Sequence, residues 1–331
     1  MTPPETLFVS PREVRDLLTM DDCIAAVESA FRLYGEGRAA RPGVLSLHTS
    51  DGSFHIKAGL LDLDRTYFAA KVNGNFPENP ARFGLPTIQG VIVLCDAELG
   101  CPLAIMDSRD ITSLRTGAAT AVAAKHLARP GSRTVTICGC GSQGRVQIKA
   151  LSRVFRLESV FAYDKDHEQM LRFAREVTEE HGLPTHPVTN FHSAVSQSDI
   201  CVTCTPSRQA YLGADDISPG TFISAVGADN PDKQELHPGL MAKSKIVTDI
   251  LEQCAVMGDL HHALDAGVVT KANVHAELGE VVAGKKVGRE SDDEIIVFDS
   301  TGMALQDIAA AALVYEKAQE RGLGMRLSLA A

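Results

Sequence analysis

The chain has 331 residues, of which 44% are hydrophobic and 22% are charged, a composition typical of a globular protein. Its 42 acidic side chains outnumber its 32 lysines and arginines, and the formal net charge of −10 argues against a nucleic-acid partner. No apolar run is long enough to span a bilayer, and the first residues lack the basic and apolar regions of a secretory signal. We therefore expect a cytoplasmic protein with no membrane partner and with two domains.

The first third of the chain predicts two helices followed by a sheet of antiparallel strands. The helices lie within residues 11–38, with Asp21 or Asp22 as the N-cap of the second, and they end before Arg41-Pro42. Apolar stretches separated by turn residues are expected to form strands at 43–48, 54–58, 67–73, 88–95 and 102–107. We expect one face of this sheet to pack on the early helices.

The strand at residues 54–58 alternates between apolar and basic side chains. Phe54 and Ile56 point to one face, which we expect to be the core, while His55 and Lys57 point to the other. Two interpretations of the basic pair remain open: a solvated polar face of the sheet, or part of a pocket for an acidic group.

After a connector helix at residues 109–128, the chain changes to alternating strands and helices. A β-branched apolar run at 134–138 leads directly into Gly139-x-Gly141-x-x-Gly144, and a helical pattern follows. A dinucleotide-binding turn needs this order: Gly139 permits the tight turn, Gly141 lets the backbone approach a pyrophosphate, and Gly144 lets the helix pack on the strand. The N–H groups and the dipole at the helix start favour the bound anion.

An acidic residue ends the next predicted strand. Residues 159–163 are largely apolar, and Asp164 follows, 20 positions beyond Gly144. A carboxylate there accepts both ribose hydroxyls of an adenosine and repels a 2′-phosphate, so the pattern favours NAD over NADP. The alternative is a nucleotide fold that binds no nucleotide.

The rest of the chain predicts a doubly wound parallel sheet. Further strands are expected at 187–189, 200–205, 221–226, 245–249 and 295–298. An Ala-rich helix at 304–321 returns to the first domain. Ligands of such sheets bind beyond the carboxyl ends of the strands, where Asp164, Thr205, Asp229 and Ser300 lie.

Eight cysteines raise the question of a metal or disulfide site. Cys138 and Cys140, and Cys201 and Cys204, fall in runs that resemble central strands, where cysteine acts as a small hydrophobic residue. Structural zinc sites usually place their cysteine pairs on turns, so we expect no metal.

Several separate segments match one known family. They are 71–80, 84–87, 113–119, 139–144, 227–229, 233–236 and 298–302. Through them the chain resembles the ornithine cyclodeaminase/mu-crystallin family over nearly its full length, and most closely members of the archaeal alanine dehydrogenase type. The family includes cyclodeaminases, alanine dehydrogenases, ketimine reductases, an iminosuccinate reductase and a thyroid-hormone-binding member. The resemblance therefore constrains the cofactor more than the substrate.

The resemblance implies a fold and an assembly. A Rossmann-type, NAD-binding domain at residues 119–304 would be inserted into an α+β substrate-binding and dimerisation domain made of 1–118 and 305–331. Two copies would form a homodimer through their antiparallel sheets. The other expected partner is a small imino or amino acid.

The resemblance also implies roles for individual residues. Arg41 resembles the arginine that holds the substrate α-carboxylate, Lys71 the catalytic lysine, and Asp229 the catalytic acid or base. Lys71 and Arg115 are also expected to contact the substrate. His55 and Lys57 join the expected substrate contacts because of the strand alternation and not because of the resemblance. The expected cofactor contacts are Thr87, Arg115, Thr116, Gly139, Gly141, Ser142, Gln143, Gly144, Asp164, Thr203, Thr205, Val226, Ala228 and Ser300.

The expected reaction is the reduction of an α-imino acid by NADH. An arginine suits the α-carboxylate, and a lysine or carboxylate of tuned pKa can keep the imine nitrogen protonated. His55 and Lys57 depart from the family, which has glutamate (cyclodeaminases) or arginine (alanine dehydrogenase) at the first position and methionine at the second. A cationic ornithine tail is then disfavoured, and we expect iminosuccinate to be reduced to aspartate. The alternatives are alanine dehydrogenase, cyclic ketimine reductase, ornithine cyclodeaminase with catalytic NAD, and a binding protein without catalysis.

Overall fold

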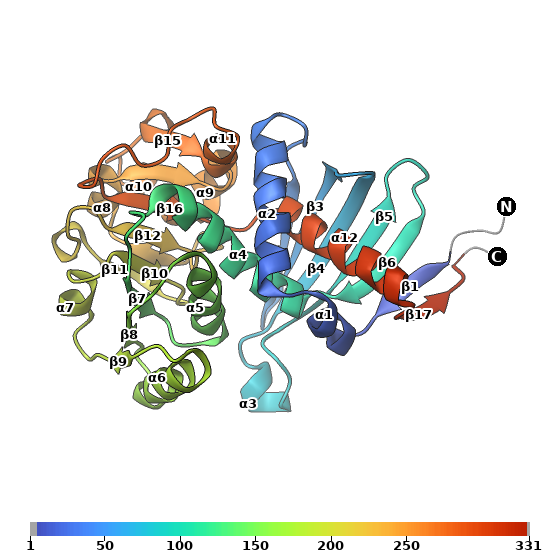
Figure 1. Ribbon diagram of the computed structural model, residues 1–331, viewed down its shortest axis with the longest axis horizontal. Coiled ribbons are helices and arrows are strands. Elements are labelled where there is room, and N and C mark those ends of the chain that lie inside the picture. The colour runs from blue at the N-terminus through green and yellow to red at the C-terminus, as the bar shows by residue number, and fades with distance from the viewer. Residues whose placement is uncertain (1–4, 330–331) are drawn as a thin grey trace. The chain divides into compact units, whose positions relative to one another are not determined.

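The computed structural model describes residues 5–329, which divide into two compact units (Figure 1). The first unit comprises Met1–Arg115 and Met303–Ala331, and the second comprises the intervening Thr116–Gly302. One unit contains an antiparallel sheet and the other a parallel sheet, which confirms the predicted α/β fold class.

The first unit is built on a seven-stranded sheet in the order β17-β1-β6-β5-β4-β3-β2. Its strands are β1 (Thr6–Val9), β2 (Gly43–His48), β3 (Ser53–Asp62), β4 (Thr66–Asn75), β5 (Ile88–Asp96), β6 (Pro102–Asp107) and β17 (Met325–Leu327). Neighbours are antiparallel except for β1 and β6, which run parallel. The prediction missed β1 and β17, because strands of four and three residues carry too little alternation.

Three helices pack on one face of this sheet: α1 (Pro11–Leu17), α2 (Met20–Gly35) and α12 (Ala304–Arg321). A short helix, α3 (Asn79–Phe83), follows β4. The predicted N-cap of the second helix, Asp21 or Asp22, was wrong. Thr19 is the N-cap, and its hydroxyl accepts the backbone N–H of Asp22 in a capping box.

The two faces of the sheet are used in the opposite way to the prediction. Along β3, Lys57 is only 9% exposed, on the face that α12 covers, whereas Phe54 is 40% exposed on the other face. Ile56, also expected in the core, shares the open face with Phe54 and is only half-buried. Large apolar side chains are 40–52% exposed there, namely Leu45, Leu47, Phe54, Leu60 and Val91. Alternation separates two faces but does not tell which one a distant helix covers.

The second unit contains an eight-stranded parallel sheet in the order β15-β14-β16-β12-β10-β7-β8-β9. Its strands are β7 (Thr134–Cys138), β8 (Ser159–Tyr163), β9 (Thr185–Pro187), β10 (Ile200–Thr203), β12 (Phe222–Ala225), β14 (Lys245–Thr248), β15 (Val274–Glu277) and β16 (Ile296–Asp299). The sequence order reverses between β7 and β10, as in Rossmann folds. The prediction missed β15, and it missed the separate pair β11 (Arg208–Leu212) and β13 (Gln234–Leu236).

Helices connect these strands. They are α4 (Arg109–Leu127), which enters the unit from the first, then α5 (Ser142–Val154), α6 (His167–His181), α7 (Phe191–Val195), α8 (Pro238–Lys243), α9 (Leu251–Met257), α10 (Asp259–Asp265) and α11 (Leu278–Val282), with the 3-10 turns η1 (Ala214–Asp216) and η2 (Lys271–Asn273). None of the helices within residues 5–329 is long and apolar enough to cross a membrane. The predicted cytoplasmic location stays a prediction.

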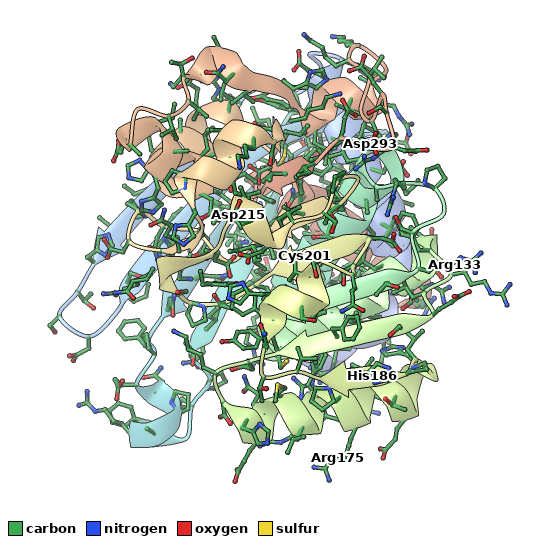
Figure 2. All side chains as sticks on the ribbon, turned by 90° about the vertical axis from the view of Figure 1, so that its left-hand side faces the viewer. Arg133, Arg175, His186, Cys201, Asp215 and Asp293 are labelled. Atoms are coloured by element: carbon green, nitrogen blue, oxygen red, sulfur yellow. The ribbon has the colours of Figure 1, made fainter. Side chains whose placement is uncertain are left out.

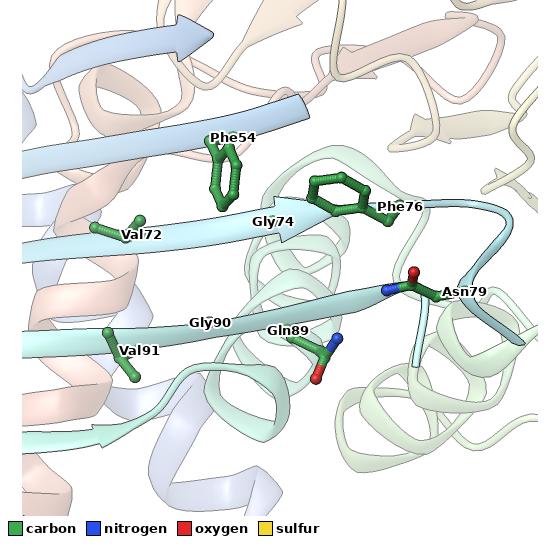
Figure 3. Close-up of a pocket in the computed structure, with 8 residues that line it drawn as sticks. All are labelled: Phe54, Val72, Gly74, Phe76, Asn79, Gln89, Gly90 and Val91. Carbon is green, nitrogen blue, oxygen red and sulfur yellow. The ribbon is translucent and has the colours of Figure 1, made fainter. Parts of the chain in front are cut away.

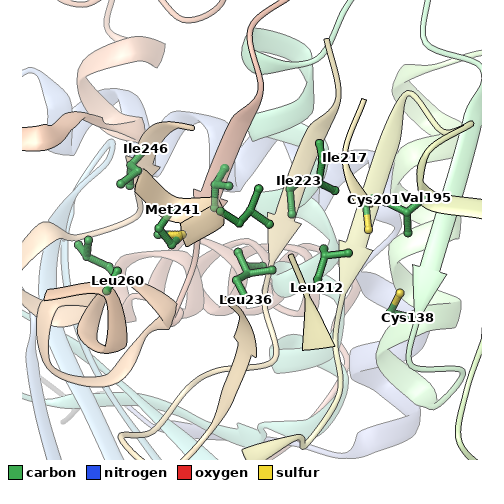
Figure 4. Close-up of a cluster of buried hydrophobic side chains, with 14 of the residues drawn as sticks. Cys138, Val195, Cys201, Leu212, Ile217, Ile223, Leu236, Met241, Ile246 and Leu260 are labelled. Atoms are coloured by element: carbon green, nitrogen blue, oxygen red, sulfur yellow. The ribbon is translucent and has the colours of Figure 1, made fainter. Parts of the chain in front are cut away.

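The cysteines of the second unit behave as core residues. Cys138 and Cys201 lie in a cluster of buried apolar side chains between the sheet and its helices (Figure 4). Charged side chains such as Arg133 and Arg175 extend outward instead (Figure 2). Cys140 and Cys204, which were expected in strands, lie just beyond the ends of β7 and β10. Across the described part of the chain, no group of histidines, cysteines and carboxylates could hold a metal ion.

Candidate functional site

The glycine turn of the second unit has the backbone that its spacing predicts. Gly139 has a φ of +109°, and an added Cβ there would lie 2.8 Å from the carbonyl oxygen of Cys204. A Cβ on Gly144 would lie 2.3 Å from the carbonyl oxygen of Gly139, so helix and strand pack too closely for any side chain. A Cβ on Gly141 would meet no atom within 4 Å, and no side chain caps α5 at this residue. The start of α5 is therefore open to an anion, as a dinucleotide pyrophosphate requires.

Asp164 is held against this turn. Its Oδ2 accepts the backbone N–H of Cys140 at 2.7 Å and the amide of Gln169 at 2.9 Å, and its Oδ1 accepts the N–H of Asp166 at 2.9 Å. Arg145 braces the turn from α5 by donating to the carbonyl oxygens of Cys140 and Gly141 at 2.6 and 3.0 Å. The sequence analysis missed Gln169 and Arg145, because only the folded turn shows their contacts.

The other predicted cofactor residues of the second unit follow neighbouring strands. Val226 donates its N–H to the carbonyl of Thr203, and Ser300 donates to that of Ala225, so the ends of β10, β12 and β16 lie side by side. Thr205 and Ala228 follow β10 and β12, while Ser142 and Gln143 begin α5 and Thr116 lies in α4. This row of strand ends is where ligands of parallel sheets bind.

Asp229 lies in the loop after β12. Its side chain is 51% exposed and forms an ion pair with Lys233, with 2.7 Å between Oδ1 and Nζ. The loop contains a further close contact, between Gly227 and the buried Glu235, which the sequence analysis did not single out.

Four charged side chains meet inside the first unit. Lys71 lies on β4, Lys57 is its cross-strand partner on β3, Arg115 comes from α4 and Asp307 from α12. The Lys71 Nζ is 2.6 Å from Asp307 Oδ2, and the Arg115 Nε is 3.1 Å from Asp307 Oδ1. All four are at most 9% exposed. The structure thus brings together three of the predicted residues around a carboxylate that the prediction lacked.

The charges of this cluster shift each other's pKa values. Burial lowers the pKa of Lys71 to about 7; Arg115 and Lys57 add to the decrease, and Asp307 opposes it. Burial by itself raises the pKa of Asp307, but Lys71 and Arg115 outweigh it and hold that pKa below its usual value. When ionised, the three cations exceed the one carboxylate, so the cluster favours a bound anion.

The sequence analysis missed Asp307 and its neighbour Gln306, although two polar residues in an Ala-rich helix are a recognisable pattern. Gln306 accepts a hydrogen bond from Arg115 Nη1 at 3.0 Å through its Oε1. Both residues are buried in α12, where Ala and Leu otherwise dominate. Polar residues on the apolar face of a buried helix need partners, and this requirement could have indicated them.

The other predicted residues of the first unit lie outside this cluster. The ring nitrogens of His55 are 3.0 and 2.8 Å from the hydroxyls of Ser46 and Ser53. Arg41 is exposed in the loop after α2, and Thr87 precedes β5 and accepts the N–H of Phe76 through its carbonyl. The roles of Arg41, His55 and Thr87 stay predictions.

The first unit also carries a largely apolar depression of about 500 Å³ (Figure 3). Phe54, Val72, Phe76 and Val91 line it, and the Phe54 and Phe76 rings meet edge to face at 5.5 Å. Val72 points away from the face that carries its neighbour Lys71. The depression is therefore part of the open apolar face and not of the charged cluster.

Comparison with known proteins adds a second line of argument. A model of the ornithine cyclodeaminase/mu-crystallin family matches residues 4–322. An archaeal alanine dehydrogenase, solved as a dimer with bound NAD, is 42% identical to this chain and superimposes with a TM-score of 0.94. The match covers 98% of this chain and 100% of the alanine dehydrogenase.

Two further structures are similar over their whole length. The Δ1-pyrroline-2-carboxylate reductase of Thermococcus litoralis, in complex with NADH and L-proline, is 34% identical with a TM-score of 0.92, over 97% of this chain and 100% of its own. The iminosuccinate reductase of Paracoccus denitrificans, in complex with NAD+, is 31% identical with a TM-score of 0.91, over 98% and 100% of the two chains.

Proposed function

The chain belongs to the ornithine cyclodeaminase/mu-crystallin family, and from this premise we propose that it is an NADH-dependent reductase of α-imino acids. Run in reverse, the same chemistry is that of an amino-acid dehydrogenase. The observation that carries the proposal is the buried cluster of Lys57, Lys71 and Arg115 around Asp307. Such a cluster suits a substrate that is anionic and that must gain a proton at nitrogen.

The NAD(H) site is proposed to lie in the second unit, Thr116–Gly302, and in residues 303–304, which complete the predicted domain at 119–304. The start of α5, which no side chain caps and where an added Cβ on Gly141 would meet no atom within 4 Å, suits the pyrophosphate. Asp164, fixed beside that turn, suits the ribose hydroxyls. NADH bound there would supply hydride chemistry to the site.

Lys71 is proposed to supply the proton. In its charged form it donates a proton to the imine nitrogen, and the resulting iminium carbon accepts a hydride more readily. The nitrogen lone pair forms the new N–H bond, the electrons of the C=N double bond return to nitrogen as the hydride adds, and Lys71 is left neutral. It regains its proton from solvent. A pKa of about 7 suits this exchange, because both forms are then populated near neutral pH.

Other residues are proposed to bind the substrate or to assist. Arg41 would hold the α-carboxylate, and Asp229 would take part in the proton transfer. Lys57, with His55, would contact a distal carboxylate, because Lys57 is buried and is the cross-strand partner of Lys71. We therefore propose iminosuccinate as the substrate and aspartate as the product.

A substrate panel tests the proposal. The purified protein is mixed with NADH and iminosuccinate, with pyruvate and ammonia, with Δ1-pyrroline-2-carboxylate, or, using NAD, with ornithine. If kcat/KM for NADH oxidation is highest with iminosuccinate, the result supports an imino dicarboxylate as the substrate. Preference for either smaller imine would instead indicate an alanine dehydrogenase or a cyclic ketimine reductase. Tight NADH binding without turnover of any substrate would contradict an enzymatic role.

We also propose that the protein is a homodimer joined through the open apolar face of the first unit. That face carries Leu45, Leu47, Phe54, Leu60 and Val91, and large exposed apolar patches mark interfaces. The archaeal alanine dehydrogenase is a dimer.

Light scattering after size exclusion measures the mass of each variant. Val91→Glu should give monomers, because it places a charge within that face. Leu99→Glu, on the turn before β6 and 75% exposed, is the control and should leave the dimer intact. A dimeric Val91→Glu variant would contradict this assembly.

A further inference from the structure

Glu235 is a fully buried carboxylate that joins two loops of the second unit. It lies in β13, and its Oε1 accepts the N–H of Thr205 at 2.6 Å, the Thr205 hydroxyl at 2.7 Å and the Tyr211 hydroxyl at 3.1 Å. Its Oε2 accepts the N–H of Gly227 at 3.0 Å. Thr205 follows β10 and Gly227 follows β12, so one side chain spans the loops at two adjacent strand ends.

The contact with Gly227 leaves no space for a side chain. A Cβ on Gly227 would lie 2.5 Å from Glu235 Oε2 and 2.5 Å from the carbonyl oxygen of Thr205. The carboxylate, the Thr205 carbonyl and the Gly227 backbone are therefore packed against one another. This packing gives a physical reason for a glycine two residues before Asp229.

Both oxygens of Glu235 act as acceptors, and an ionised carboxylate, which has no donor of its own, matches all four contacts. Burial raises the pKa of Glu235, while the hydrogen bonds from Thr205 and Tyr211 oppose that rise. The four donated hydrogen bonds thus offset part of the cost of burying the charge.

The backbone of Glu235 is itself anchored. Asp259 Oδ1 accepts the N–H groups of Glu235 and Leu236, each at 2.8 Å. The N–H of Asp259 in turn points to Asp299 Oδ1 at 3.3 Å, at the end of β16. A series of buried carboxylates therefore links the end of β16 to the loops after β10 and β12.

We propose that Glu235 is a positioning residue that fixes the loops carrying Thr205 and Asp229 for binding of the nicotinamide cofactor and for catalysis. The inference rests on the proposed function, since it assigns Glu235 to the same reaction. Glu235 acts through the two loops, and its own carboxylate is enclosed by their backbone and by Tyr211.

Glu235→Gln gives a specific test, because the amide has nearly the same size but only one acceptor oxygen. That oxygen will face the three donors that Oε1 now serves, and the NH2 group will face the N–H of Gly227. The Gly227 loop should then loosen. Hydrogen exchange measures this directly, and the amide of Gly227 should exchange faster in the variant than in the natural protein.

Asp199→Asn is the matched control. Asp199 also accepts two backbone N–H groups, those of Arg133 and Thr134 at 2.7 and 3.0 Å, but it does so where β7 and β10 begin, away from the loops after β10 and β12. Both variants should lower the melting temperature, Asp199→Asn in part because it weakens the ion pair of Asp199 with Arg129. Only Glu235→Gln should lower kcat, by about 10- to 100-fold, because small displacements of positioned groups have effects of this size.

A double-variant cycle separates positioning from general destabilisation. If Glu235 acts through the Asp229 loop, Glu235→Gln should reduce kcat far less in an Asp229→Asn background than in the natural protein. Should Glu235→Gln not fold, Tyr211→Phe removes one of the four hydrogen bonds and should lower kcat a few-fold with accelerated exchange at Thr205.

The hydrogen-exchange measurement and the kcat measurement test the positioning role independently. Unchanged exchange at Gly227 in folded Glu235→Gln, or a kcat equal to that of Asp199→Asn, would overturn the positioning role. Multiplicative losses of kcat in the cycle would also overturn it. If the protein reduces no imine at all, the proposed function fails, and exchange at Gly227 together with NADH affinity still decides whether Glu235 organises the cofactor loops.

Discussion

Replacing Asp307 by asparagine should shift the pH dependence of the enzyme. The change keeps the shape of the side chain but removes the negative charge 2.6 Å from the Lys71 Nζ. The remaining charged neighbours of Lys71 are the cations Arg115 and Lys57, which both disfavour its protonation. The pKa of Lys71, about 7 in the natural protein, should therefore fall further.

The size of the shift follows from the distance. A single opposite charge within hydrogen-bonding range changes a pKa by about one to three units. If charged Lys71 donates the proton for reduction, half of the natural protein is competent at pH 7. A decrease of one to three units leaves roughly 9% to 0.1% competent, a loss of about 5- to 500-fold at that pH.

The assay is the pH profile of kcat/KM for imine reduction. In the natural protein, activity should fall as the pH rises through about 7, and in Asp307→Asn the same limb should appear at lower pH. Glu316→Gln is the control, since it removes a carboxylate from the same helix that accepts from the Tyr67 hydroxyl instead. A limb at the same pH in Asp307→Asn and Glu316→Gln would refute the assignment of Lys71 as the titrating proton donor.

Three further predictions concern cofactor choice, chemistry and stability. Asp164→Ser should weaken NADH and improve NADPH in kcat/KM, since the carboxylate that opposes a 2′-phosphate is lost; equal use of both cofactors by the natural protein would contradict this. Lys71→Ala and Asp229→Ala should each lower kcat by about 10²- to 10⁴-fold while NADH still binds in a fluorescence titration. The folded pKa of Lys71 is depressed, so between about pH 7 and 10.5 the unfolded chain holds a proton that the folded protein lacks. Urea unfolding should therefore show the stability of the natural protein, relative to Lys71→Met, increasing from pH 7 to pH 9.

The parts of the fold that depend on local geometry could be predicted from the sequence. Gly139 is required because its φ is positive, and Gly144 is required because the helix packs closely on the strand. The spacing of the glycines in the sequence indicates both requirements. The alternation along β3 could also be predicted, and it places Lys57 and Phe54 on opposite faces of the sheet.

The parts that depend on distant segments could not be predicted. Arg115 and Asp307 are 192 positions apart, and only the packing of α12 brings Asp307 to the basic face of the sheet. For the same reason the sequence did not indicate that Phe54 lies on the open face. Glu235 lay within a segment that resembles the family, but its contacts with Thr205 and Gly227 appear only when the loops after β10 and β12 are folded.

The most direct test of the proposed substrate is the ratio of kcat/KM for iminosuccinate over iminopropionate, measured in the natural protein and in Lys57→Met. Lys57 is buried beside Lys71, where a charge-assisted contact to a second carboxylate contributes about 1.5–3 kcal/mol, or about 10- to 100-fold. The natural protein should prefer iminosuccinate, and Lys57→Met should remove most of that preference while keeping activity on iminopropionate. An unchanged ratio would show that Lys57 does not contact the substrate, and it would contradict the reduction of an imino dicarboxylate as the function built into this cluster.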